Sequence, residues 1–62
     1  MKVILPDGTE TKTGPGTVDE ILERLGCNPY EVLAARDGEL LLGDDFCSDG
    51  DTLKLTSIVH GG

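Results

Sequence analysis

The residues with the clearest chemical potential stand at the end of the chain, where Gly61 and Gly62 follow a segment typical of a β-strand. Glycine has no Cβ atom, so two successive glycines can extend through a channel that is too narrow for any side chain. The carboxyl group of Gly62 would then reach a second protein as a reagent. A terminal carboxyl with a pKa of about 3.5 is ionised at neutral pH and unreactive toward nucleophiles. It therefore needs activation, most simply as a mixed anhydride with AMP.

The enzyme that activates this carboxyl group has to be a separate protein. The chain contains no G-x-x-x-x-G-K-S/T loop that could bind the phosphates of ATP. We therefore expect a cosubstrate or carrier, not an enzyme, and we expect no cofactor. An inert, frayed end is the alternative, because the sequence holds 9 glycines in 62 residues.

Two cysteines and one acidic segment are the candidates for redox or metal chemistry. Neither Cys27 nor Cys47 belongs to a C-x-x-C pair, which disfavours zinc and redox sites. We expect both thiols to be small apolar core residues. The acidic segment 44–51 resembles a calcium loop only superficially, because the alternating oxygen ligands and the closing glutamate are missing. No metal site is expected.

His60 and the lysines are weaker candidates for chemistry. The charge of a histidine can switch near neutral pH, but His60 has no evident orienting partner and is a poor candidate for a general base. Lys2, Lys12 and Lys54 could accept an isopeptide bond from a second copy. Solvated surface lysines are the simpler interpretation.

The charge balance indicates which kinds of partner the protein can bind. The chain has 5 basic and 12 acidic residues, for a formal net charge of -7. Such a surface repels phosphate backbones and anionic headgroups, so direct nucleic-acid and membrane binding are disfavoured and partners with basic surfaces are expected. No apolar run approaches the roughly 20 residues of a membrane span, and the start of the chain does not resemble a signal peptide. We expect a cytoplasmic protein.

The element with the strongest local signals is a helix between Thr17 and Gly26. Thr17 and Glu20 match the capping-box pattern at a helix N-terminus, and Gly26 suits the left-handed position that ends a helix. The apolar residues between them fall at i, i+3, i+4 and i+7, which places them on one face. These residues are Val18, Ile21, Leu22 and Leu25.

The remaining segments predict a small mixed sheet. Because 62 residues bury only about 60% of their unfolded surface, we expect a single domain over residues 1–62 with a flexible Gly-Gly tail. The first and last strands are the most apolar and should form a central parallel pair. The helix must cover one face of the sheet, which gives an α+β, β-grasp (ubiquitin-like) fold. The expected strands are 1–5, 9–13, 31–36, 39–42 and 52–59, and Tyr30 and Phe46 are expected to fill the core.

The alternation of the last strand predicts which side chains lie on the open face of the sheet. Leu53 and Leu55 should face the helix, and Ile58 should then be exposed next to the tail. We expect a modest apolar patch for docking the activating enzyme. Single exposed aliphatic residues often need no such explanation. The patch would consist of Ile58, Ile4, and Val32 or Ala34.

Residues 49–62 carry a family resemblance. They combine an Asp-Gly-Asp turn, an alternating strand, an aliphatic pair and a terminal Gly-Gly. This pattern resembles the C-terminal signature of ThiS/MoaD-type sulfur carriers and of the small archaeal modifier proteins. The likeness extends more loosely upstream through the capped helix, residues 25–29 and residues 32–42. The middle section is most similar to the tRNA-thiolation carriers and the archaeal modifiers.

The resemblance implies a ubiquitin-like fold and a defined reaction at the tail. In such proteins an E1-like enzyme adenylates the terminal glycine, which is then converted to a thiocarboxylate. The sulfur passes to a synthase or thiolase that makes thiamine thiazole, molybdopterin or a thiolated tRNA base. Gly62 would carry the reacting carbonyl, and Gly61 would give it access. Two alternatives stay open: a modifier that forms isopeptide bonds with target-protein lysines, and an inert β-grasp binding module.

Overall fold

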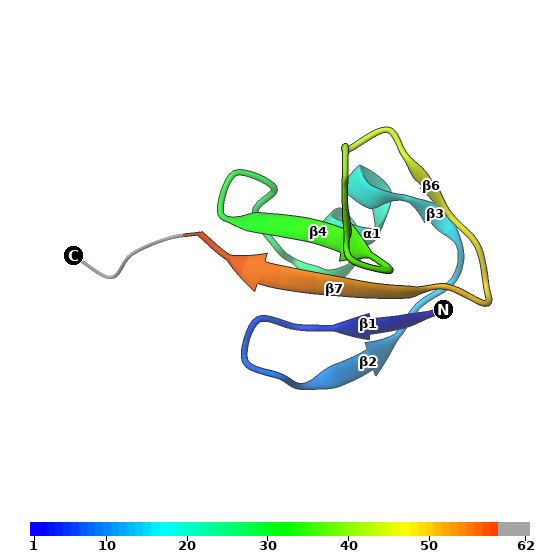
Figure 1. Ribbon diagram of the computed structural model, residues 1–62, viewed down its shortest axis with the longest axis horizontal. Helices are drawn as coiled ribbons and strands as arrows, with labels where there is room; N and C mark the ends of the chain where they lie inside the picture. The colour runs from blue at the N-terminus through cyan, green and yellow to red at the C-terminus, as the bar shows by residue number, and fades with distance from the viewer. Residues whose placement is uncertain (59–62) are drawn as a thin grey trace.

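The computed structural model describes residues 1–58, which form one helix and two sheets (Figure 1). The α+β, β-grasp fold class expected from the sequence is confirmed. The elements in chain order are β1 (Lys2–Ile4), β2 (Glu10–Lys12), β3 (Gly16–Thr17), α1 (Val18–Leu25), β4 (Val32–Arg36), β5 (Glu39–Leu41), β6 (Phe46–Cys47) and β7 (Thr52–Ser57).

The larger sheet has the strand order β2-β1-β7-β4-β5, with β7 in the middle. Figure 1 shows β7 between β1 and β4. Strands β1 and β7 are parallel, with Val3 opposite Leu53, as the apolar character of the first and last strands predicted. Strand β4 pairs with the other edge of β7 in the antiparallel sense. The last strand of the described chain is therefore held from both sides.

The helix begins and ends where the capping residues predicted. The Thr17 hydroxyl accepts a hydrogen bond from the backbone N–H of Glu20 at 3.2 Å. The Glu20 carboxylate accepts one from the backbone N–H of Thr17 at 3.0 Å, which completes the capping box. The bond from the Thr17 backbone N–H is the main reason why the pKa of the Glu20 carboxyl group is lowered. Gly26 ends the helix with φ of 72°, a conformation that a residue with a Cβ atom rarely adopts.

The core lies between α1 and one face of the larger sheet. Cys47 is fully buried in it, which confirms the expectation of a core residue. Cys27 was also expected in the core, but it is only partly buried and packs against the core. Both thiols are unpaired. The buried residues are Val3, Val18, Ile21, Leu22, Ala34, Cys47, Leu53 and Leu55.

The two aromatic residues were expected in the core, and this expectation is wrong. Tyr30 is 88% exposed and Phe46 is 59% exposed. Phe46 precedes Cys47 in strand β6, a two-residue strand that pairs with β3 inside the segment expected to be an acidic loop. Successive side chains of a strand point to opposite sides. Because Cys47 occupies the interior position, Phe46 points outward.

Tyr30 is exposed because the turn between α1 and β4 holds it away from the core. The Asn28 side chain accepts a hydrogen bond from the backbone N–H of Tyr30 at 2.9 Å. The Asn28 carbonyl then accepts one from Glu31 at 3.0 Å. This short turn brings the chain to the start of β4, and Tyr30 stands on its outer side.

The last strand was expected to extend to residue 59, whereas β7 ends at Ser57. Residues Val59, His60, Gly61 and Gly62 lie outside the described residues. No helix within residues 1–58 is long and apolar enough to cross a membrane.

Substitutions on the two sides of β7 should differ strongly in their effect on stability. Leu55 is buried, so Leu55→Ala should lower the free energy of unfolding by about 2–5 kcal/mol. Thr56 is exposed in the same strand, so Thr56→Ala should lower it by less than about 1 kcal/mol. Urea denaturation followed by circular dichroism measures both values. Equal losses would contradict the assignment of the two faces.

Candidate functional site at the end of strand β7

The described chain positions the base of the tail. Ser57, the last residue of β7, lies opposite Val32 of β4. The backbone N–H of Ile58 then donates a hydrogen bond to the Glu31 carbonyl at 2.9 Å. The path of the chain is therefore fixed by main-chain hydrogen bonds up to Ile58. The sequence-predicted site residues Gly61 and Gly62, and the weaker candidate His60, lie outside the described residues.

The start of β7 is fixed by Asp51, the last residue of the Asp-Gly-Asp turn. Its carboxylate accepts a hydrogen bond from the backbone N–H of Ser48 at 2.8 Å and one from the Arg36 guanidinium at 3.1 Å. Its carbonyl accepts a bond from the backbone N–H of Lys2 at 3.1 Å. The bond from Ser48, and to a smaller extent the Arg36 guanidinium, lower the pKa of Asp51. Asp51 thus joins the start of β7 to β1 through Lys2 and to β4 through Arg36.

Arg36 also links this turn to the core. Besides pairing with Asp51, its guanidinium donates to the carbonyl of Phe46 at 3.0 Å, at the edge of the small second sheet. The next residue is Cys47, whose thiol has a raised pKa because it is buried, although Arg36 partly offsets this effect. A buried thiol with a raised pKa is a poor nucleophile near neutral pH. Cys47 therefore acts as a core residue.

The register of the sheet decides which side chains lie on its open face. Side chains that are directly opposite in neighbouring strands share a face. Lys54 lies opposite Ile4 on one side and Ala35 on the other, so all three face away from α1. Leu33 lies opposite Thr56 and is 42% exposed, and Ile58 is 43% exposed. The open face thus carries aliphatic side chains beside the point where the tail begins.

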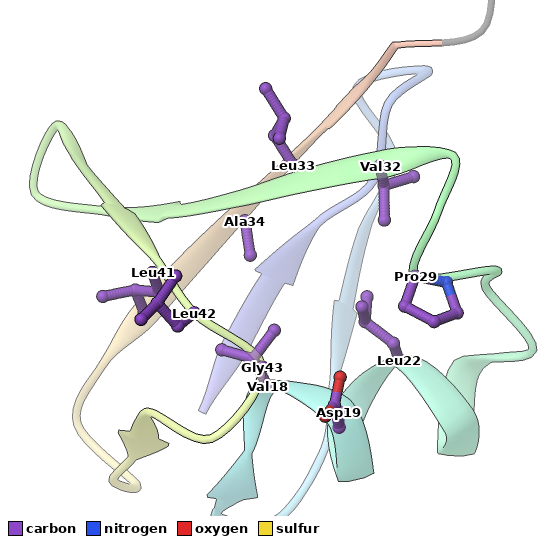
Figure 2. Close-up of a pocket in the computed structure, with 10 residues that line it drawn as sticks. All are labelled: Val18, Asp19, Leu22, Pro29, Val32, Leu33, Ala34, Leu41, Leu42 and Gly43. Carbon is purple, nitrogen blue, oxygen red and sulfur yellow. The ribbon is translucent and has the colours of Figure 1, made fainter.

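Two of the residues expected in the docking patch lie on the other side of the sheet. Ala34 is only 5% exposed and lies opposite Leu55, so it belongs to the core. Val32 points to the same side and packs against the core. The expected placement of Val32 or Ala34 on the open face is therefore wrong, whereas Ile4 and Ile58 lie there as predicted. Figure 2 shows Leu33 pointing away from Val32 and Ala34.

The sequence interpretation missed two open-face residues, Leu33 and Leu40. Residues 32–35 are all apolar, so alternation along β4 alone does not indicate which set of its side chains is buried. Only the register of β4 against β7 settles the choice.

On the helix side, α1, β4 and the segment after β5 enclose a shallow hollow of about 190 Å³ (Figure 2). Asp19 is the only titratable residue among the described residues that line it, so the hollow offers no pair of groups for acid–base or nucleophilic catalysis. Residues 1–58 contain no cluster of His, Cys, Asp or Glu that could hold a metal ion. The hollow is lined by Val18, Asp19, Leu22, Pro29, Val32, Leu33, Ala34, Leu41, Leu42 and Gly43.

The role of Asp51 at the base of β7 predicts a pH-dependent loss of stability. Since the pKa of Asp51 is lowered in the folded protein, its contribution is complete above the ordinary aspartate pKa of about 3.9 and is lost as the pH falls through the folded-state pKa. Asp51→Asn should therefore be less stable than the wild type near neutral pH. The difference should shrink in strong acid, where the carboxyl group is protonated in both states.

Asp49→Asn is the matched control for this experiment. Asp49 lies in the same turn and is exposed, and within residues 1–58 its side chain takes part in no hydrogen bond or ion pair. Its replacement should leave the urea midpoint almost unchanged at every pH. If Asp49→Asn and Asp51→Asn lowered the free energy of unfolding equally at neutral pH, the role assigned to Asp51 would be contradicted.

Comparisons with known proteins agree with this architecture. The chain is 40% identical to the sulfur carrier protein TtuB of Thermus thermophilus, and the match covers 100% of both chains. Its fold is similar to the crystal structure of the thiamine biosynthesis protein ThiS from Geobacter metallireducens, with a TM-score of 0.67, 21% identity and 100% of each chain covered. A scan against protein-family models found no match.

The two similarities carry different weight. At 21% identity the likeness to ThiS shows the fold, a β-grasp domain of the same extent. At 40% identity over both full lengths, the likeness to TtuB shows common descent with a sulfur carrier, a protein that carries a group and does not catalyse a reaction. The chain therefore belongs to the family of ThiS/MoaD-type sulfur carrier proteins.

Proposed function

We propose that Gly62 is the residue that carries the sulfur. The observation that supports this proposal most strongly is the full-length similarity to a sulfur carrier in a chain that ends in Gly61-Gly62. An E1-like enzyme would adenylate the Gly62 carboxylate, with release of pyrophosphate from ATP. A sulfur donor would then displace AMP and leave a thiocarboxylate. Gly61 would give the reacting carbonyl access to the enzyme.

The fold supports this proposal by holding the base of the tail. Strand β7 is hydrogen-bonded on both sides, and the bond from Ile58 to the Glu31 carbonyl extends this support to the last described residue. An enzyme that binds the folded domain would therefore receive the tail from a fixed point. Gly61 and Gly62 have no side chains, so they can enter a narrow nucleotide pocket.

We further propose that the activating enzyme docks on the aliphatic part of the open face. Ile58 and Leu33 are exposed there, and Ile4 is half-buried on the same face further from the tail, opposite Lys54. Exposed aliphatic side chains that gather on one face are typical of interaction sites. Leu33 takes the place that the sequence interpretation gave to Val32 or Ala34.

The sulfur would next pass to a separate synthase or thiolase in the cytoplasm. Thiamine thiazole, molybdopterin and a thiolated tRNA base are the candidate products. The resemblance of the middle section to the tRNA-thiolation carriers favours the tRNA base. Conjugation of Gly62 to lysines of other proteins stays an alternative prediction, because it would use the same activated carboxyl group.

Removal of Gly61 and Gly62 should abolish adenylation. The full chain, mixed with its cognate activating enzyme, should support ATP–pyrophosphate exchange, whereas the chain that ends at residue 60 should support none. Gly50→Ala is the matched control, since a Cβ atom there would contact nothing within 4 Å and the tail is unchanged. Full exchange by the truncated chain would contradict the proposal.

A charge at Ile58 should weaken docking without unfolding the domain. Because Ile58 is exposed, Ile58→Asp should keep the urea midpoint close to that of the wild type. If this residue is central to the interface, the KM for the carrier in the exchange assay should rise about tenfold or more.

Leu42→Asp is the control for this variant. Leu42 is also an exposed aliphatic residue, but it lines the hollow on the helix side. Its replacement should leave the KM unchanged. An equal KM for Ile58→Asp and the wild type would refute docking at this face.

A further inference from the structure

All three lysines of the chain lie on the open face of the sheet. Lys2 and Lys12 are directly opposite each other across β1 and β2. Lys54 occupies the neighbouring strand, opposite Ile4, which is two residues from Lys2 and therefore on the same face. All three side chains are exposed. The two arginines, by contrast, contact loop segments on the helix side or at the edge of the sheet.

Acidic residues are scarce on this face, although the chain has 12 of them. Among the described strand residues that point to the open side, Glu10 is the acidic one, and it forms an ion pair with Lys2 at 3.7 Å. Glu31 precedes β4 and lies beside Ile58, at the end of the face where the tail begins. The remaining carboxylates lie on α1, in turns and loops, or on the other side of the strands. The open face is thus locally basic on a chain of net charge -7.

The lysines lie in the middle and at the far end of the open face, whereas Ile58 and Leu33 lie at the tail end. Lys54 is flanked by Ile4 and Ala35 in the middle of the sheet, and Lys2 and Lys12 lie further from the tail. Ile58 lies at the tail end, four positions along the chain from Lys54, or about 13 Å at about 3.3 Å per residue. Leu40, opposite Ala35, is also exposed in the middle of the face. The face is therefore aliphatic at the tail end, mixed in the middle and basic at the far end.

We infer that the basic end of the open face binds carboxylates of the activating enzyme. This inference rests on the proposed function, in which that enzyme docks on this face. The fitting surface is apolar where it meets Ile58 and acidic about 13 Å from that point, where it meets Lys54. The net charge of the chain alone predicted basic partner surfaces. On this face the local charge is the reverse, and charge complementarity follows the local surface.

The same charge distribution would orient the carrier. An acidic enzyme surface repels α1 and the acidic loops and attracts only the open face. Repulsion of wrong orientations is a common source of specificity at interfaces. The tail would then point toward the nucleotide pocket in the encounter complex.

A nucleic-acid backbone fits this face less well. The three lysines share the face with exposed aliphatic residues, which offer nothing to a phosphate backbone, and the net charge of -7 repels phosphates at longer range. An enzyme surface with both apolar and acidic parts matches both features of the face. Binding of RNA at this face would overturn the inference.

The test is the KM for the carrier in ATP–pyrophosphate exchange with the cognate activating enzyme. Lys54→Gln should raise the KM about threefold, and Lys54→Glu about tenfold, at low ionic strength. Both effects should decrease as salt is added, because salt screens exposed charges. The kcat should not change, since the inference gives Lys54 a role in docking alone.

Arg24→Gln is the matched control. It makes the same change in net charge, but Arg24 lies on the helix and contacts the Gly14 carbonyl at 2.9 Å. Its KM should stay at the wild-type value, and urea midpoints check that every variant is folded.

Three results would overturn the inference. The KM of the Lys54 variants could be unchanged, it could fall, or Lys54→Gln could abolish binding of a labelled RNA duplex with the KM unchanged. Absence of exchange by the wild-type chain would instead refute the proposed function, so the two failures are distinguishable.

Discussion

The structure depends on one constraint: within residues 1–58 a single helix of eight residues has to cover a five-stranded sheet. It can bury only one face, so every strand must divide its side chains between an apolar side and an open side. The division is clearest in β7, where Leu53 and Leu55 are buried and Lys54 is exposed. Because the core is so small, one face of the sheet stays exposed, and the side chains on that face are available to contact a partner.

That division also links the fold to its function. The residues that fix β7 in the sheet also fix the base of the tail, since the pairing with β4 continues to the bond between Ile58 and Glu31. At the other end, Asp51 joins the start of β7 to Arg36. Hydrogen bonds thus hold the strand that leads to the glycine end, and we propose that its open side is the surface from which a partner approaches. Most acidic residues lie elsewhere on the molecule, so the open face differs in charge from the rest of the surface.

Features that depend on residues close together in the sequence were predicted correctly. Features that depend on the register between distant strands were not. The capping box needs only Thr17 and Glu20, which are three residues apart, so the sequence alone predicted it. The face of Ala34 depends on its pairing with β7, and an apolar strand contains no pattern that fixes this pairing. Leu33 was missed for the same reason. Phe46 was misplaced because size favours aromatic burial, but the two-residue strand β6 has one interior position and Cys47 takes it.

The position of the sulfur on the chain can be determined by mass spectrometry. The protein would be incubated with ATP, its activating enzyme and a sulfur donor, and then analysed intact and as fragments. If Gly62 carries the sulfur, the mass should rise by the exchange of one oxygen for sulfur, and the gain should be confined to the C-terminal fragment and to Gly62. An unchanged mass, or sulfur found only on Cys27 or Cys47, would contradict the proposal.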